Sequence, residues 1–118
     1  MRYCIYFLCF FALFSCTDNL SESKICNVKN PLIDLVWLKE IKTGLEISTS
    51  ASKKKITQFT YNNESVFLVD ICINCTDNLT SLYSCDGTIV CEFGGIAGLN
   101  TCPDFDKNAT NEIILWEN

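Results

Sequence analysis

Five of the nine cysteines in this chain fall in one stretch with the spacing C-x2-C-x9-C-x5-C-x10-C. They are Cys72, Cys75, Cys85, Cys91 and Cys102. Cysteine thiolates can exchange disulfides or bind zinc. A thioredoxin-like pair needs its first cysteine at a helix N-terminus, and no helical pattern follows Cys72-Ile-Asn-Cys75. A paired zinc knuckle needs two C-x2-C units, and the chain has one. We therefore interpret these cysteines as structural.

The remaining inventory of reactive side chains is small. The chain has no histidine, and its only arginine is Arg2. Sites of the Ser-His-Asp, Cys-His and HExxH types are therefore excluded. The formal net charge is -5, and an acidic chain without guanidinium groups binds nucleic-acid phosphates poorly. We nominate no catalytic residue, no metal site and no cofactor, and we expect a non-enzymatic protein without a nucleic-acid partner.

A polar segment near the C-terminus has some features of a calcium loop. From Asp104 onward, oxygen-bearing side chains stand at alternate positions. The sixth position of such a loop needs glycine and the twelfth needs glutamate, but these positions hold Ala109 and Leu115. We interpret the segment as a polar loop before the last strand.

The N-terminal residues are typical of an export signal, because Arg2 precedes an apolar run that is too short to cross a bilayer comfortably. Leu13-Phe14-Ser15-Cys16 resembles the lipobox of bacterial lipoproteins, which implies lipidation of Cys16 and anchoring in the cell envelope, on either face of the outer membrane. The expected organisation is a signal peptide at 1–15, a tether at 16–29 and one small domain at 30–118. The alternative is secretion, with cleavage after Thr17.

Six cysteines remain once Cys4, Cys9 and Cys16 are set aside. They are Cys26, Cys72, Cys75, Cys85, Cys91 and Cys102. An even number in a short exported chain predicts three disulfides formed in an oxidising compartment.

The pairing of these cysteines depends on the turn at Asp86-Gly87. A two-residue turn there would set Cys85 opposite Thr88 and Leu82 opposite Cys91. Cys85 and Cys91 would then face opposite sides of the ribbon. We expect Cys91 to pair with Cys102 and Cys85 to pair with Cys72 or Cys75. Cys26 would then pair with the other one of Cys72 and Cys75.

Periodicity predicts an α+β fold. Asn30-Pro31 favours the start of a helix, apolar residues recur at helical spacing over 32–42, and Gly44 favours its end. Lys53-Lys54-Lys55 reads as a solvated connection. Strand patterns follow at 56–61, 66–73, 79–85, 88–93 and 112–117. We expect one helix packed on a mostly antiparallel sheet of four or five strands, stapled by disulfides.

Three motifs resemble those of an uncharacterised family of short bacterial lipoproteins. They are Trp37-Leu38-Lys39, Gly94-Gly95-Ile96-Ala97-Gly98 and Cys102-Pro103-Asp104-Phe105. The resemblance covers 32–105. It implies an envelope lipoprotein, and it supplies no catalytic residue.

The glycine-rich loop is the candidate binding surface. Its residues are Gly94, Gly95, Ile96, Gly98 and Asp104. A loop closed by a disulfide has little conformational entropy left to lose on binding. We expect a lipid-anchored module that contacts the membrane through its lipid and binds an unknown protein or glycan. The alternative is a secreted or anchored inhibitor of a hydrolase.

Overall fold

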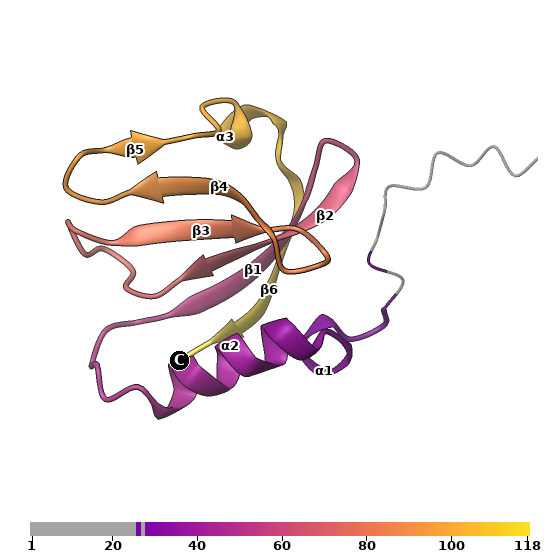
Figure 1. Ribbon diagram of the computed structural model, residues 1–118, viewed down its shortest axis with the longest axis horizontal. Coiled ribbons are helices and arrows are strands. Elements are labelled where there is room, and N and C mark those ends of the chain that lie inside the picture. Colours follow the sequence, from indigo (N-terminus) through magenta and orange to yellow (C-terminus); the bar gives the residue numbers. More distant parts are fainter. Residues whose placement is uncertain (1–25, 27) are drawn as a thin grey trace, which may run out of the picture.

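The computed structural model describes Cys26 and residues 28–118. The expected signal peptide, Cys16 and most of the expected tether lie outside these residues. The elements, in chain order, are α1 (Pro31–Asp34), α2 (Val36–Ile47), β1 (Lys55–Tyr61), β2 (Glu64–Asp70), β3 (Leu79–Tyr83), β4 (Ile89–Gly94), β5 (Leu99–Asn100), α3 (Phe105–Asn108) and β6 (Thr110–Glu117) (Figure 1). No helix in the described part of the chain is long and apolar enough to span a membrane.

The six strands form one antiparallel sheet in the order β5-β4-β3-β2-β1-β6. The predicted α+β class is confirmed, but the predicted four or five strands are too few. The missed strand is β5, which has only two residues and follows directly after the glycine-rich loop. A strand that short carries no alternating pattern, because alternation needs about four residues to be recognised.

The N-terminal helical region differs from the single helix that was predicted. Leu35 adopts an extended conformation between α1 and α2, with φ -92° and ψ 103°. Helix α2 also runs past Gly44 and ends at Ile47. The prediction that Gly44 ends the helix is therefore wrong.

Lys54 accounts for the later end of α2. Its side chain is only 3% exposed. Its Nζ donates hydrogen bonds to the carbonyl oxygens of Leu45, Ser48 and Ser50, at 3.2, 3.5 and 3.2 Å. The last carbonyls of a helix have no partner within the helix and form the negative end of its dipole, so an ammonium group stabilises them. The prediction that Lys53-Lys54-Lys55 is solvated is wrong for Lys54.

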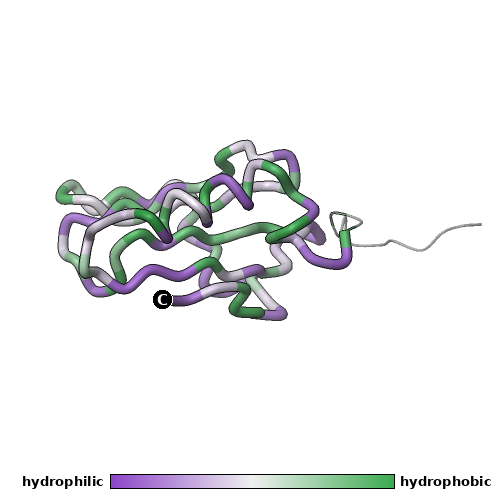
Figure 2. Tube along the Cα trace, turned by 90° about the horizontal axis from the view of Figure 1, so that it is seen from below, coloured by the Kyte–Doolittle hydropathy of each residue, from purple (hydrophilic) through white to green (hydrophobic). Residues whose placement is uncertain are grey.

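The sheet has two differently covered faces. Side chains alternate along a strand, so Phe67 and Val69 of β2 face the opposite side from Val66 and Leu68. On the first side, which we call the helix face, Leu38 of α2 is buried with Ile56, Phe67 and Val69. On the other side, which we call the groove face, the buried cluster consists of Tyr61, Val66, Leu82, Cys91 and Phe105. Figure 2 shows that parts of the trace are hydrophobic over several consecutive residues.

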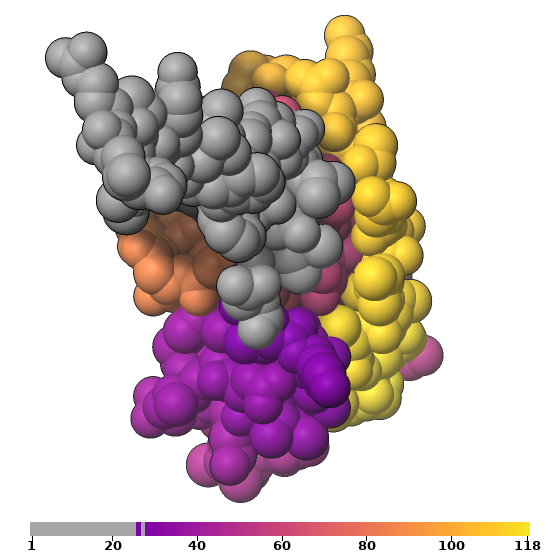
Figure 3. Space-filling model, turned by 90° about the vertical axis from the view of Figure 1, so that its right-hand side faces the viewer, coloured from indigo at the N-terminus to yellow at the C-terminus, as the bar shows by residue number. Residues whose placement is uncertain are grey.

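The last strand lies beside the first helices, although they are far apart in the sequence (Figure 3). Leu115 and Trp116 of β6 pack against the same cluster as Leu38. The pairing of β6 with β1 shifts register twice. Asn111, with φ 54°, lies at one of these shifts. Such bulges increase twist and make an edge strand a poorer template for pairing with another chain.

Three disulfides join the described cysteines: Cys26–Cys85, Cys72–Cys75 and Cys91–Cys102. The predicted Cys91–Cys102 pair is confirmed. The predictions that Cys85 pairs with Cys72 or Cys75, and that Cys26 pairs with the other of these two, are wrong.

Strand register explains the error in pairing. Phe67 of β2 lies opposite Tyr83 of β3, so Cys85 lies near Ser65 at the start of β2. Cys72 follows the other end of that strand. At about 3.3 Å per residue, the part of β2 from Ser65 to Asp70 alone spans about 17 Å, which no disulfide can bridge.

The turn between β3 and β4 has three residues rather than the predicted two. The Ser84 N–H donates to the Thr88 carbonyl at 2.9 Å, so Cys85 is not opposite Thr88. Hydrogen bonds, chiefly from the Ser84 hydroxyl and then from Thr88, lower the pKa of Asp86 to about 2. A register shift after Leu82 restores the predicted pairing of Leu82 with Cys91.

Candidate binding groove

A groove with a volume of about 500 Å³ opens on the groove face of the sheet. This volume is within the range of sites that bind small molecules or side chains. Its apolar lining comes from four elements: Leu68 of β2, Phe93 of β4, Leu99 of β5 and Phe105 of α3. The groove exists because α3 covers only part of this face.

Phe105 positions one end of the groove. Its ring lies 5.3 Å from that of Phe59, 5.2 Å from that of Tyr61 and 5.4 Å from that of Phe93, measured between centroids. Aromatic pairs at these separations attract one another beyond simple burial of area. Phe105 is itself buried, so it fixes the position of the half-buried Phe93 in the apolar floor of the groove.

Two carboxylates also line the groove, Asp70 at the end of β2 and Asp106 in α3. Asp70 Oδ1 accepts hydrogen bonds from Asn78 Nδ2 at 2.6 Å and from the Cys72 N–H at 3.1 Å. Asp106 is exposed. The groove therefore combines an apolar floor with two negative charges.

The glycine-rich loop forms one rim of the groove, through Gly94 and Gly98. Gly94 has φ 92°, and a Cβ there would lie 2.3 Å from the carbonyl oxygen of Asn78. Only glycine permits this approach. The next residue, Gly95, donates its N–H to the same carbonyl at 2.8 Å. Cys91–Cys102 joins β4 to the chain after β5 and so closes the loop.

Three residues of the predicted binding loop, Gly95, Ile96 and Asp104, do not line the groove. Ile96 is 91% exposed. Asp104 accepts a hydrogen bond from the Tyr61 hydroxyl at 2.7 Å and another from Asn108 Nδ2 at 3.1 Å. The hydrogen bond from Tyr61 is the main cause that lowers the pKa of Asp104, and it raises the pKa of Tyr61. Asp104 thus holds α3 to β1. Asp106, two residues further along the chain, lines the groove instead of Asp104.

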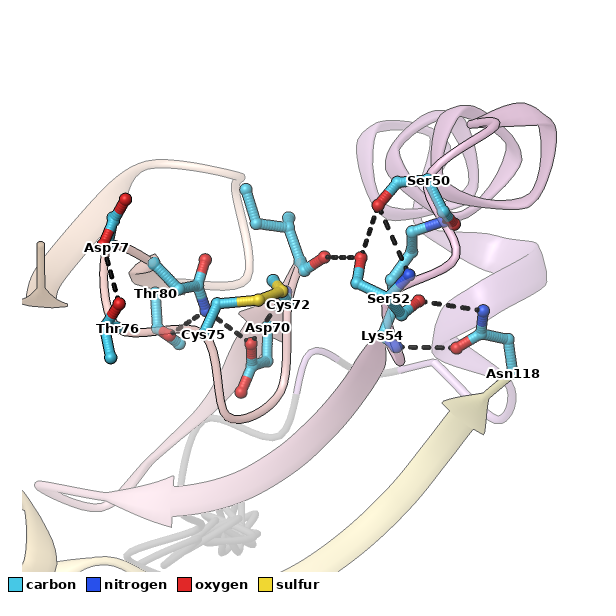
Figure 4. Close-up of a disulfide and its surroundings, with 12 residues drawn as sticks. Ser50, Ser52, Lys54, Asp70, Cys72, Cys75, Thr76, Asp77, Thr80 and Asn118 are labelled. Carbon is cyan, nitrogen blue, oxygen red and sulfur yellow. Dashed lines mark hydrogen bonds between the residues drawn. A yellow bond between two sulfur atoms is a disulfide. The ribbon is translucent and has the colours of Figure 1, made fainter.

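The loop after β2 carries Cys72–Cys75 and docks against the segment before β1 (Figure 4). The Ile73 N–H donates to the Lys53 carbonyl at 2.8 Å, and the Ser52 hydroxyl donates to the Ile71 carbonyl at 3.3 Å. Asp70 joins this loop to the groove through its bonds to Cys72 and Asn78. Within Cys26 and residues 28–118, no group of three or more His, Cys, Asp and Glu side chains is placed to hold a metal ion.

A family model matches residues 43–118, and its description is a domain of unknown function, DUF6970. The match covers well over half of the chain. The chain belongs to the DUF6970 family. The DUF6970 match contains all six strands and every residue that lines the groove, but neither α1 nor Cys26. No curated protein and no solved structure matched the chain.

Much of the groove of this DUF6970 domain was not predicted from the sequence. Asp106 entered only as part of the polar segment that lacks two features of a calcium loop, and Leu68, Phe93 and Leu99 were given no role in binding. The sequence does contain one sign that Asp70 has a special role, because Asp70 is a charged residue in an otherwise apolar strand pattern at 66–73.

Proposed function

We propose that this DUF6970 protein is a non-enzymatic binding module of the bacterial envelope, held to the membrane by a lipid on Cys16, and that it binds its partner in the groove. The observation that carries the proposal is the position of the glycine-rich loop. Gly94 and Gly98 form a rim of a groove with an apolar floor, and such concave apolar sites with a few polar groups are where ligands bind.

The groove is preorganised, which favours binding. Its rim is held by the Cys91–Cys102 disulfide and by the hydrogen bond from Gly95 to Asn78. A rigid rim loses little conformational entropy when a partner binds, so more of the contact energy is available as affinity.

Anchoring by lipid is supported by the lipobox-like Leu13-Phe14-Ser15-Cys16. Three disulfides in the described residues are consistent with export, since such bonds persist in oxidising compartments. Mass spectrometry of protein extracted from membranes tests this part of the proposal. We expect a mature N-terminus at an acylated Cys16, and any other N-terminus would refute the anchor.

The role of the groove is tested by a matched pair of variants. Leu99→Trp places an indole at the groove, whereas Ile89→Trp places one on β4 outside the residues that line it. Both positions are exposed and apolar. Envelope components captured by the wild-type protein should be retained by Ile89→Trp and lost by Leu99→Trp. Equal capture by both variants would contradict a binding role for the groove.

A second candidate function, inhibition of a hydrolase, is favoured by one observation. Ile96 is almost fully exposed in a loop whose base is closed by Cys91–Cys102, and rigid loops of this kind suit insertion into an active site. Assays against a panel of proteases and lysozymes test it. Inhibition that Ile96→Asp abolishes would support this function, and no inhibition at micromolar protein would exclude it for the enzymes assayed.

A further inference from the structure

The charge of the groove indicates what kind of ligand it binds. Asp70 and Asp106 are the ionisable residues among those that line it. They come from different elements, β2 and α3, and no lysine stands beside them in the lining. The whole chain is also acidic, with a formal net charge of -5. A cleft lined by one sign of charge concentrates ligands of the opposite sign.

The apolar floor restricts the ligand further. Leu68, Phe93 and Leu99 offer contacts to methylene groups, and the faces of phenyl rings attract cations. A side chain that combines an aliphatic stem with a terminal ammonium group satisfies both the floor and the carboxylates. Both hydrogen bonds to Asp70 from the described residues end on Oδ1, and Oδ2 accepts neither of them.

The position of the groove at a sheet edge suggests how the ligand is presented. Strand β5 contributes Leu99 and Asn100 to the lining, and it is the last strand of the sheet on that side. Extended peptides bind at such edges, with alternate side chains entering neighbouring pockets. The Gly94 and Gly98 rim adds no side chain that would block this approach.

We propose that the groove binds a lysine side chain of an extended polypeptide segment, with the aliphatic stem on the floor and the ammonium group between Asp70 and Asp106. This inference rests on the proposed function and names the ligand of the same site. The lysine belongs to a partner protein, and a free alkylamine is the alternative ligand that the test separates from it.

The test is a titration followed by amide NMR shifts, with the full protein as its bacterial expression host processes it. The probe is a blocked pentapeptide of alternating leucine and lysine, and the matched probe carries acetyl-lysine instead. We expect saturable shifts at Phe93, Leu99 and Asp106. Acetylation should weaken binding about tenfold or more, because it removes the charge-assisted hydrogen bonds.

Two variants with the same change of charge complete the test. Asp106→Asn should weaken binding of the lysine peptide about tenfold. Asp77→Asn removes an exposed carboxylate that bonds Thr76 outside the groove, and it should leave the affinity unchanged. The exposed position of Asp106 keeps the substitution out of the core, and an unchanged amide spectrum away from the groove confirms the fold.

Three results would overturn the inference. They are equal affinity for the acetylated peptide, equal weakening by Asp106→Asn and Asp77→Asn, and binding of 1,5-diaminopentane as tight as that of the peptide. If a neutral or anionic ligand shifts the groove amides and is excluded by Leu99→Trp, the lysine inference fails and the proposed function stands. If Leu99→Trp captures the same envelope components as the wild type, the proposed function itself fails.

Discussion

On the helix face of the sheet, Leu38 from a helix of twelve residues is fully buried against Ile56 and Phe67. On the groove face, the four-residue α3 contributes one buried residue, Phe105, and leaves Leu68 and Phe93 half-buried. Burial of apolar area is the main source of stability in a small domain. Both faces contribute buried residues to the core. The difference teaches that α2 covers its part of the helix face, whereas the short α3 leaves part of the groove face uncovered, and this is where we propose that a partner binds.

The disulfides follow the same division. Cys26–Cys85 packs with the helix-face cluster and spans 59 residues of sequence. Cys91–Cys102 packs with the groove-face cluster and spans 11. The first ties the start of the domain to the sheet, and the second shapes one rim of the groove.

Neighbouring residues of β2 offer the largest test of this comparison. Phe67 faces α2 and is fully buried, whereas Leu68 faces the groove and is half-buried. Phe67→Ala should lower the free energy of unfolding by about 4 kcal/mol, because it leaves a cavity in the core. Leu68→Ala should cost about 1 kcal/mol, since the lost side chain was partly solvated already. Urea unfolding measures both, and equal losses would contradict the division of roles.

Removal of a single disulfide should lower stability by an amount that increases with the length of the loop that the disulfide closes. In the chain-entropy model, replacing both Cys26 and Cys85 by serine costs about 4 kcal/mol, and replacing both Cys72 and Cys75 costs about 2 kcal/mol, because the second pair closes a much shorter loop. Thermal unfolding of the two double variants measures the difference. A greater loss from the Cys72 and Cys75 variant would show that native-state contacts of that loop outweigh chain entropy.

The buried ammonium group of Lys54 can be compared with the exposed Lys53 beside it. Lys54→Met should lower the free energy of unfolding by about 2 kcal/mol, because the carbonyls of Leu45 in α2 and of Ser48 and Ser50 just after it lose their donor. Lys53→Met should change it by less than about 0.5 kcal/mol. Denaturant midpoints of the two variants check this prediction, which fails if both lysines matter equally.

The hydrogen bond between Tyr61 and Asp104 should make the smallest of these contributions to stability. It should be visible as a dependence of the free energy of unfolding on pH. Folding lowers the pKa of Asp104, so its contribution is present above the unfolded pKa and is lost as pH falls through the folded pKa. Folding raises the pKa of Tyr61, so its contribution is present below the unfolded pKa and is lost as pH rises through the folded pKa.

Tyr61→Phe should therefore differ in stability from the wild type by a constant amount at intermediate pH, and by less at both extremes. Unfolding curves collected across the pH range for the two proteins measure this difference. If the difference in stability between Tyr61→Phe and the wild type does not change with pH, the proposed electrostatic role of the Tyr61–Asp104 pair is contradicted.

Features with short-range signals in the sequence could be predicted, and features that depend on distant contacts could not. Alternating or continuous apolar patterns predicted the longer strands, and the glycine-rich loop between Cys91 and Cys102 suggested the disulfide that closes it. The end of α2 depends on Lys54, which approaches it only in the folded chain. The partner of Cys85 depends on strand register.

The groove shows the same limit. Gly94 and Gly98 were predicted as part of a binding loop because glycines cluster visibly in the sequence. Asp70 and Asp106 are far apart in the sequence, and only the order of the strands and the position of α3 bring them to one groove.

The most direct test of the central claim is an amide NMR shift map of the labelled protein with a partner captured in the experiment proposed above. Binding at the groove predicts shifts at Leu68, Phe93, Leu99 and Asp106, with the amides of α2 unchanged. The outer surface of α2 also exposes apolar residues, Val36 and Ile47. Shifts confined to those two residues and their neighbours would contradict the claim that the groove face binds the partner.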